Sequence, residues 1–329
     1  MSQVVVVTGA SAGVGRAAAR AFARSGDAVG LAAPDSDGLE GAAREVAAEG
    51  GTPMPLPTDV ADEDQVEAAA EAVERELGPI DVWVNNAMTT VFAPFSEVEP
   101  DEFRRATEVT YLGVVWGTRA ALRRMRRRNR GTIVEVGSAL AYRGIPLQAP
   151  YCGAKHAIKG FVESLRAELL HDGSGVHVTM VQLPALNTPQ FEIGRTKMDR
   201  HPQPVPPIYQ PEVAADAIVW ASRHRRREMH VGGPTVKTIW GNKLFPALGD
   251  RYLARNGYEA QLTDERLEGG REGNLFSPVP GDHGAHGRFH DARRRSFQLA
   301  LSKHRLALTG VAGTAALGVA AIAARRPRR

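Results

Sequence analysis

The chain has 329 residues, enough for one large α/β domain with an extension or for two domains, and its 43% hydrophobic content is ample for a packed core. A single cysteine, Cys152, excludes an intrachain disulfide framework and indicates a reducing compartment, so we expect a cytoplasmic protein without a secretory signal. The net charge of +4 is uneven, because residues 288–329 hold ten Lys or Arg and one Asp, a local balance of +9 that leaves −5 for residues 1–287. A basic face on the folded domain is therefore not expected, which argues against nucleic-acid binding.

The first predicted elements are a strand, a glycine-rich turn and a helix. Residues 3–7 form a β-branched run, and an Ala-rich helix ends near Ser25. Between them lies Thr8-Gly9-Ala10-Ser11-Ala12-Gly13-Val14-Gly15, whose glycines permit positive φ and close backbone approach before a helix N-terminus that favours anions. This order predicts a cradle for the phosphates of a dinucleotide, although the spacing is Gly-x-x-x-Gly-x-Gly and not Gly-x-Gly-x-x-Gly.

The next segments alternate between strand and helix patterns up to residue 231. Strands are predicted over residues 28–33, 80–84, 132–137, 176–183 and 228–231, and helices over 38–50, 62–77, 102–128, 151–170 and 212–223. Such alternation predicts an α/β fold of the Rossmann type, with one doubly wound parallel sheet.

Tyr151 and Lys155 are four positions apart in a predicted helix. They should lie on one helix face, where the phenol and the ammonium can meet the same substrate. A phenol ionises near pH 10, and a neighbouring cation lowers its pKa. Ser138 follows the predicted strand 132–137, at the end where open α/β sheets bind their ligands. A hydroxyl there can hold a carbonyl or alcohol oxygen while Tyr151 moves the proton.

Together these motifs resemble the short-chain dehydrogenase/reductase family over about residues 1–240. The matching pieces occur in the family's order and spacing, and they are Thr8–Gly15, Asp59-Val60, Asn85-Asn86-Ala87, Ser138, Tyr151 with Lys155, and Pro184 with Thr188. The resemblance implies an NAD(P)-dependent oxidoreductase that transfers hydride between nicotinamide and a carbonyl or secondary alcohol. Tyr151 would be the general acid/base, Lys155 would lower its pKa and bind ribose, and Ser138 would hold the oxygen.

The resemblance also implies the cofactor site and the assembly. The cofactor would contact Thr8, Gly9, Ser11, Gly13, Val14, Gly15, Asp59, Val60, Asn86, Ala87, Tyr151, Lys155, Pro184 and Thr188, with no metal ion. Asp59 would lie at the adenine edge, and Thr188 would bond the carboxamide or a phosphate. The helices over 102–128 and 151–170 are the faces through which relatives usually pair, so a homodimer or homotetramer is expected.

Several positions depart from the family's pattern. Thr110 stands where an Asn usually helps to hold a water of the proton relay, and Met88 and Ala185 stand where glycines are usual. We retain Thr110 as a catalytic candidate because its hydroxyl can also bond water. An alternative hypothesis is a dinucleotide-binding sensor or scaffold of the same fold with weakened turnover.

The end of the second predicted strand leaves the form of the cofactor open. An acid there would bind the ribose of NAD and a following Arg would accept the phosphate of NADP, but these positions are Ala33 and Pro34. Asp35 is close to the acid position but displaced from it. We favour NADP over NAD because related sequences often carry Ala-Arg here.

The remaining segments are less regular. Residues 191–209 are Pro-rich and are expected to form a substrate lid, and an apolar substrate is predicted from Phe191, Ile193, Met198, Ile208 and Tyr209. Residues 241–298 are predicted to be a loop-rich extension without assigned chemistry. Their histidines His283, His286 and His290 are not expected to bind metal.

The tail over residues 299–329 contains a candidate transmembrane helix. Residues 306–324 carry no charge and lie between basic clusters. As a helix they would extend about 28 Å, close to the ~30 Å thickness of the bilayer hydrocarbon. Few of them are strongly apolar, so insertion is expected to be marginal and to be assisted by attraction of the Arg clusters to anionic lipid. We predict anchoring at the cytoplasmic face of a membrane, with a helix packed within the protein as the alternative.

Overall fold

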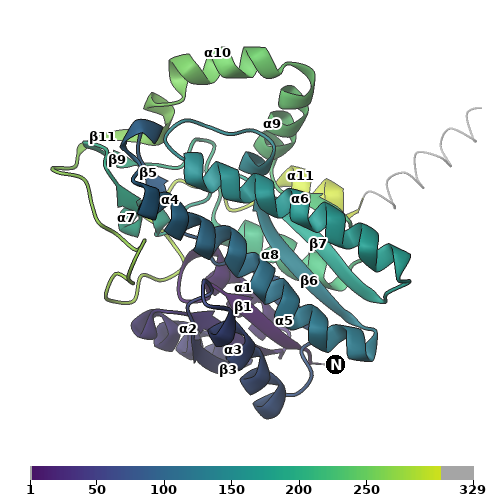
Figure 1. The fold of residues 1–329 in the computed structure, drawn as a ribbon. Coiled ribbons are helices and arrows are strands. Elements are labelled where there is room, and N and C mark those ends of the chain that lie inside the picture. Colours follow the sequence, from purple (N-terminus) through teal and green to yellow (C-terminus); the bar gives the residue numbers. More distant parts are fainter. Residues whose placement is uncertain (1, 305–329) are drawn as a thin grey trace, which may run out of the picture.

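The computed structural model describes residues 2–304 and contains a seven-stranded parallel sheet with helices on both faces (Figure 1). The strand order is β10-β7-β6-β4-β1-β2-β3. The bounds are β1 Val4–Thr8, β2 Ala28–Ala33, β3 Thr52–Pro57, β4 Val82–Asn85, β6 Gly131–Ser138, β7 Val176–Leu183 and β10 Glu228–His230. This sheet confirms the predicted Rossmann-type fold. The strand order reverses between β1 and β4, and such a switch point opens a crevice at the carboxyl ends of the strands.

The two faces of the sheet are covered by separate groups of helices. One face packs against α1 (Gly13–Ala23), α2 (Ser36–Ala48) and α8 (Pro211–Arg223), in a cluster that includes Phe22, Leu39 and Ile218. The other face packs against α3 (Glu63–Glu76), α5 (Gly113–Arg128) and α6 (Ala149–His171), in a cluster that includes Val73, Met125 and Ile158. Burial on both faces explains why the central strands are continuous apolar runs.

The helix predicted over residues 102–128 is interrupted. It consists of α4 (Pro100–Thr107), a π-helical turn over Glu108–Leu112 and then α5. The prediction of one regular helix is therefore wrong at this turn. The turn contains the buried Thr110, which is hydrogen-bonded to a neighbouring loop and not to its own helix. A π turn inside a helix is frequently found beside a functional site.

The segment after β10 is more regular than its composition indicates. It contains α9 (Gly233–Leu244), α10 (Pro246–Asn256), β11 (Leu262–Arg266) and α11 (Phe297–Lys303). The predicted lid contains α7 (Gln190–Ile193), β8 (Arg195–Thr196) and β9 (Arg200–Pro202); β9 pairs with β11, and β8 pairs with β5 (Val91–Phe92). Short 3-10 turns occur at Phe95–Glu97, Ala139–Ala141 and Glu259–Gln261. The expectation of irregular structure is therefore wrong for α10 and β11.

The candidate transmembrane helix over residues 306–324 lies outside the described residues. Among residues 2–304, no helix is both long enough and apolar enough to cross a bilayer. The division of the chain at residues 240 and 298 stays a prediction.

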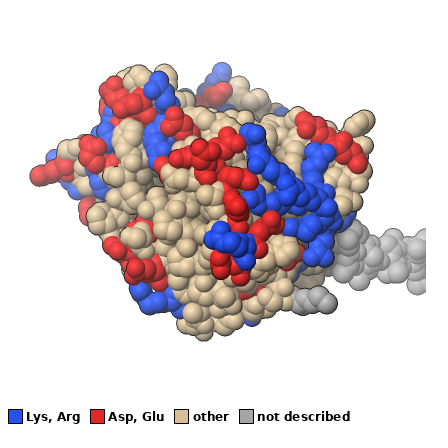
Figure 2. Space-filling view, turned by 60° about the horizontal axis from the view of Figure 1, so that its bottom comes forward, with Lys and Arg blue, Asp and Glu red and all other residues tan. Residues whose placement is uncertain are grey.

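Charged side chains of both signs share the surface that Figure 2 shows, with the densest basic group at one end of that face. The arginines at the end of α5 take part in ion pairs with neighbouring acids. Arg124 pairs with Glu67 at 2.9 Å, and Arg128 pairs with Glu74 at 2.7 Å. Arg124 is 8% exposed, so this arginine packs against the acids of α3 and does not face the solvent.

Candidate active site

A cavity of about 1170 Å³ opens at the carboxyl ends of the sheet strands. Its lining brings together residues that follow four different strands. Gly9 follows β1, Asn86 follows β4, Ser138 ends β6 and Pro184 follows β7. The volume exceeds that of a typical site for one small molecule, so the cavity has room for a dinucleotide beside a substrate.

The glycines after β1 allow the chain to turn tightly between the strand and α1. Gly9 has φ +65°, and a Cβ there would lie 2.8 Å from the Cα of Ala87. A Cβ on Gly15 would lie 2.1 Å from the carbonyl oxygen of Gly9. Side chains at these positions would push α1 away from the sheet. The glycines therefore keep the N-terminus of α1 at the cavity, where it favours a phosphate.

Thr8 and Asn86 join the ends of β1 and β4 below this turn. The hydroxyl of Thr8 accepts hydrogen bonds from the backbone N–H groups of Asn86 at 2.9 Å and Ala87 at 3.1 Å. The side-chain amide of Asn86 donates to the carbonyl of Thr8 at 3.0 Å. Thr8 and Gly15 do not line the cavity, so they would support the residues of the predicted cofactor site without contacting the cofactor. The other predicted cofactor residues all line it: Gly9, Ser11, Gly13, Val14, Asp59, Val60, Asn86, Ala87, Tyr151, Lys155, Pro184 and Thr188.

Ser138, Tyr151 and Lys155 converge on one wall of this cavity. Ser138 ends β6, while Tyr151 and Lys155 lie one helical turn apart on α6. The hydroxyl of Ser138 accepts a hydrogen bond from the N–H of Leu140 at 3.1 Å, and it acts on the phenol of Tyr151 by favouring a lower pKa. The ammonium of Lys155 is 5.5 Å from the centroid of the Tyr151 ring and donates to the carbonyl of Val136 at 2.7 Å. The three side chains therefore lie close together at one place in the cavity.

Burial controls the pKa values of this group. Desolvation raises the pKa of Tyr151 above its ordinary value, and the neighbouring Ser138 hydroxyl opposes that rise. The net direction is opposite to the lowering expected from Lys155, because loss of water around the phenol has the larger effect. Desolvation also lowers the pKa of Lys155 to about 8, opposed by the charge of Glu135.

Glu135 is a buried acid under the site that the sequence analysis treated as part of an apolar strand. It is 0% exposed on β6, and desolvation raises its pKa to about 7. Thr118 donates to it at 2.8 Å and accepts from Asn85 at 2.9 Å. The sequence did contain a signal for this residue, since a Glu stands inside a run of Val and Ile. Carboxylates are rarely buried unless they are paired, so such a position indicates a buried polar network.

The structure does not bring Thr110 to the cavity. Its hydroxyl donates to the carbonyl of Thr89 at 2.8 Å and accepts from the N–H of Thr89 at 3.0 Å, and the residue is 0% exposed. The prediction that it helps to hold a relay water therefore lacks the necessary geometry, because both of its bonds are used to position the loop after β4. Thr89 itself lines the cavity, as does Met88.

The end of the cavity near β2 contains Ala33, Pro34 and Asp35. The carboxylate of Asp35 accepts from the N–H of Gly38 at 3.1 Å and caps α2. Asp59 is paired with Arg105 at 2.6 Å, and both line the same cavity. The two acids expected near the adenosine part of a dinucleotide are therefore already engaged with the protein.

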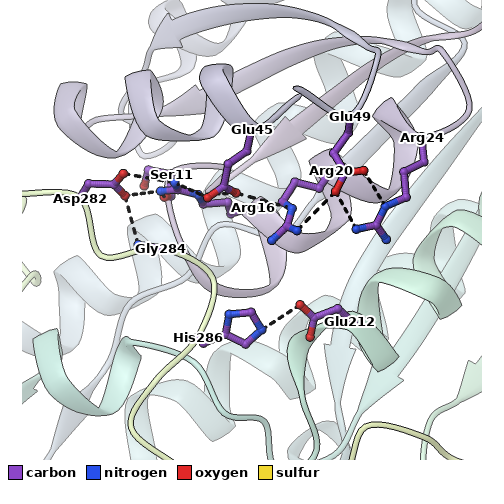
Figure 3. A network of polar contacts seen from close by, with 10 residues as sticks. All are labelled: Ser11, Arg16, Arg20, Arg24, Glu45, Glu49, Glu212, Asp282, Gly284 and His286. Carbon is purple, nitrogen blue, oxygen red and sulfur yellow. Dashed lines mark hydrogen bonds and ion pairs between the residues drawn. The ribbon is translucent and has the colours of Figure 1, made fainter. Parts of the chain in front are cut away.

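Residues 275–290 cross this end of the cavity and form a strap over it. The carbonyl of Gly284 accepts from the N–H of Gly13 at 3.0 Å, at the start of α1. Figure 3 shows Arg16 of α1 between two acids, Asp282 of the strap and Glu45 of α2. The contact between Arg16 and Asp282 joins positions that are 266 residues apart, and no local pattern in this Gly-rich stretch indicated such a role.

His286 of the strap forms a further contact with α8. Its ring lies 2.8 Å from the carboxylate of Glu212, as Figure 3 also shows. Within residues 2–304, no three His, Cys, Asp or Glu side chains are gathered in a way that could hold a metal ion.

The other end of the cavity is mostly apolar. Of the five lid residues predicted to face a substrate, Phe191 and Ile193 line the cavity and the other three do not. Tyr209 is 4% exposed and packs in the core beside α8, so its predicted contact with substrate is wrong. The missing apolar surface comes from the segment after β10, which contributes Phe245, Leu248, Tyr252 and Leu253. No local pattern indicated that these residues return to the site.

The fold and this group of side chains define a class: an oxidoreductase built on a Rossmann-type dinucleotide-binding sheet. The model of the family described as short chain dehydrogenase matches residues 3–198. The chain belongs to the short-chain dehydrogenase/reductase family, and it is an oxidoreductase of that family.

Two relatives match most of the chain in sequence. An uncharacterized oxidoreductase, YxnA of Bacillus subtilis, is 32% identical over 283 residues, which cover 85% of this chain and 80% of the relative. The probable oxidoreductase EphD of Mycobacterium tuberculosis is 35% identical over 258 residues, but these are only 43% of its length.

Two solved structures share the fold. An alcohol dehydrogenase from the archaeon Thermococcus sibiricus, in complex with 5-hydroxy-NADP, is 28% identical with a TM-score of 0.61 and covers 70% of this chain and 96% of its own. A short-chain dehydrogenase/reductase from Burkholderia phymatum, in complex with NAD, has a TM-score of 0.69 at 22% identity. It covers 75% of this chain and 95% of its own, and at that identity it supports the fold alone.

Proposed function

We propose that this protein is an NAD(P)-dependent oxidoreductase that interconverts a carbonyl group and a secondary alcohol on an apolar substrate. The observation that carries the proposal is the convergence of Ser138, Tyr151 and Lys155 in one cavity, which the glycine turn before α1 also lines. The experiment is a turnover assay with ketones, aldehydes and secondary alcohols, using each cofactor in turn. Absence of turnover across apolar members of every class would contradict it.

The residues of the cavity fit a dinucleotide. The turn at Gly9 has no space for a Cβ, and the N-terminus of α1 opens into the cavity beside Thr188. Gly13, Val14 and Thr188 would hold the phosphates, and Lys155 would bind the ribose next to the nicotinamide. When bound, the nicotinamide supplies or accepts the hydride.

The protein's own groups would handle the proton and the oxygen. Ser138 would donate a hydrogen bond to the substrate oxygen, and Tyr151 would give its proton to that oxygen during reduction or take it during oxidation. Lys155 is one helical turn away, and its positive charge would favour the phenolate form of Tyr151. Desolvation raises the pKa of Tyr151 in the cavity, so this charge would have to act against burial.

An apolar substrate is supported by the lining of the cavity beyond the catalytic group. Phe92, Leu140, Phe191, Leu248 and Leu253 all face this space. Burying such surface against a substrate contributes about 25 cal/mol for each Å² removed from water. Polar substrates of similar size would gain less and leave their own groups without partners.

The choice between NAD and NADP belongs to the same assay. The related alcohol dehydrogenase was solved with an NADP derivative, and the Burkholderia protein with NAD. In this chain Ala33 and Pro34 supply neither an acid for the ribose of NAD nor a cation for the phosphate of NADP. The carboxylate of Asp35 caps α2. We keep the preference for NADP as a prediction, to be tested by comparing kcat/KM for the two cofactors.

A second candidate is a dinucleotide-binding sensor or scaffold with weakened turnover. It is favoured by one observation, the use of both hydrogen bonds of Thr110 within the protein. Tight cofactor binding without turnover on the whole substrate panel would support it over the enzyme.

Pairing of two or four copies through α5 and α6 is part of the proposal. These helices lie next to each other on one face of the sheet in Figure 1. Light scattering of the full chain at micromolar concentration tests it, and a monomer would contradict it. Anchoring by residues 306–324 stays a prediction about residues outside the structure.

A further inference from the structure

The helix pair α9–α10 projects from the molecule beside the mouth of the cavity. Figure 1 shows α10 at the edge of the molecule, away from the sheet. None of the residues of α10 is buried, although the helix has 11 residues. The helix is joined to the rest of the protein by bonds of Arg143 to Pro246 and Asp250, whereas most helices in water depend on a packed apolar face.

This helix pair exposes an unusual number of large apolar side chains. Within 13 consecutive positions, five of them have more than half of their surface exposed, from Trp240 at 55% to Tyr252 at 65%. The five form what we call the rim patch: Trp240, Leu244, Phe245, Leu248 and Tyr252. Such a concentration of exposed apolar surface marks an interaction site more often than chance exposure.

The rim patch is continuous with the cavity. Phe245, Leu248 and Tyr252 are exposed to solvent and also line the space next to the catalytic group. A surface that covered the patch would therefore also cover the mouth of the cavity. A molecule leaving that surface could enter the cavity without crossing water.

The charges around the rim patch are almost all positive. Lys237, Lys243, Arg251 and Arg255 are exposed, and none of them forms an ion pair within the described part of the chain. The one acid in residues 233–256 is Asp250, and it is paired with Arg143 at 2.6 Å. A second copy packed on this patch by a two-fold axis would bring these cations together, which is unfavourable. An anionic surface would instead be attracted.

We propose that α9–α10 docks on the surface of an anionic lipid bilayer and that apolar substrates enter the cavity from the lipid. Aromatic and aliphatic side chains of the rim patch would insert at the level of the headgroups, with Lys and Arg beside the phosphates. This deepens the proposed function, on which the route of substrate entry rests, whereas docking itself does not require turnover. It also does not require residues 306–324.

The first test is binding of the full-length protein to vesicles of phosphatidylcholine with and without phosphatidylglycerol, measured by flotation. Replacing both Phe245 and Leu248 by Ser should weaken binding to anionic vesicles by at least about tenfold. The matched control replaces Phe95 and Leu170 by Ser, one Phe and one Leu that are exposed elsewhere. The control should bind like the original protein.

Charge is tested separately on the same vesicles. Lys243→Gln and Arg251→Gln should each weaken binding to anionic vesicles roughly fivefold, and should have little effect on neutral ones. The matched controls are Arg104→Gln and Arg127→Gln, which are exposed cations outside α9–α10. Equal losses in both sets would overturn the assignment of α9–α10, since they would show general attraction of cations to the vesicle.

The depth of docking can be read from Trp240. Lipids with brominated acyl chains should quench its fluorescence, and the quenching should be largely lost in the variant Trp240→Phe. Unchanged vesicle binding in the Phe245/Leu248 variant would overturn the proposal and assign binding to another part of the chain. If the Phe245/Leu248 variant instead binds vesicles unchanged but has a lower oligomeric state in light scattering, the partner that covers the rim patch is a second copy of the chain. Neither outcome depends on turnover, so failure here is distinct from failure of the proposed enzyme activity.

Discussion

The sheet domain and the segment after β10 are held in place in different ways. Up to β10, helices pack on both faces of the sheet, and residues such as Phe22, Met125 and Ile158 are fully buried. Beyond β10, α10 has no buried residue, and the strap combines single buried side chains such as Ala285 with polar contacts such as that of Asp282. Burial gives rigid positions, whereas a few polar contacts at the surface give positions that are easier to change.

This difference separates the chemistry from the access to it. Ser138, Tyr151 and Lys155 lie on the rigid part, which would supply the precise geometry that the proposed proton transfer needs. The strap and α9–α10 cover the two ends of the cavity from the less buried part. We therefore expect substitutions in the sheet domain to change turnover or stability, and substitutions in the later segment to change binding and release.

The largest effect is expected for Tyr151→Phe. The phenyl ring is kept and only the hydroxyl that transfers the proton is lost, so kcat should fall by about a thousandfold. Cofactor affinity, measured by fluorescence titration, should change little. The control is Tyr258→Phe, a partly exposed tyrosine that does not line the cavity. Retention of more than a tenth of the turnover in Tyr151→Phe would rule out its assigned role.

The second effect is a loss of stability, and it is expected for Glu228→Gln on β10. Desolvation tends to raise the pKa of Glu228, but His230, Tyr142 and Gln182 outweigh it and hold the pKa at about 2. Tyr142 and Gln182 donate to its carboxylate at 2.5 and 2.7 Å. A lowered pKa stabilises the fold above the unfolded value of 4.5, and this contribution disappears as the pH falls toward 2.

The substitution should therefore lower the free energy of unfolding at neutral pH by roughly 3 kcal/mol. The difference between variant and original should shrink below about pH 4, as protonation removes the same contribution. Urea unfolding at several pH values measures both effects, with Glu268→Gln as an exposed control. A difference that does not depend on pH would show that the charge of Glu228 is not what stabilises β10.

The third effect separates a structural role of Thr110 from a catalytic one. Thr110→Val keeps the shape and removes both hydrogen bonds to Thr89, so the free energy of unfolding should fall by about 2 kcal/mol. Turnover should change less than threefold if the residue only positions the loop. Thr107→Val, which removes a bond to its own helix at Phe103, is the matched control. A large fall in kcat with unchanged stability would restore the predicted relay role.

The smallest effect is expected in the strap. Asp282→Asn removes one charge from the ion pair with Arg16, so the strap should open more often and the cofactor should leave roughly fivefold faster. Stopped-flow displacement of bound cofactor measures this rate. The control is Glu49→Gln. It breaks ion pairs with Arg20 of α1 and with Arg24 at the end of α1, neither of which involves the strap, so the rate should not change. Equal rates in the two variants would show that the strap does not control release.

Local patterns were sufficient for most of the sheet and for the placement of Ser138, Tyr151 and Lys155 at its edge. The predicted strands over residues 28–33 and 176–183 have the observed bounds of β2 and β7, because buried parallel strands are recognisable as short apolar runs. Tyr151 and Lys155 could be placed on one helix face from their spacing alone. Ser138 could be placed at the edge of the sheet because it follows a recognisable strand.

Only the tertiary structure decided which distant residues complete the site. The strap reaches Arg16 from Asp282, and the apolar wall includes Leu248 and Tyr252, yet nothing near these residues in sequence indicates where they pack. The same holds for Thr110, whose hydroxyl could bond either a water or the backbone of Thr89 until both were placed in space. The spacing of apolar residues shows which face of a helix or strand will be buried. It does not show which distant segment covers that face, because contacts across more than 200 residues depend on how the whole chain folds.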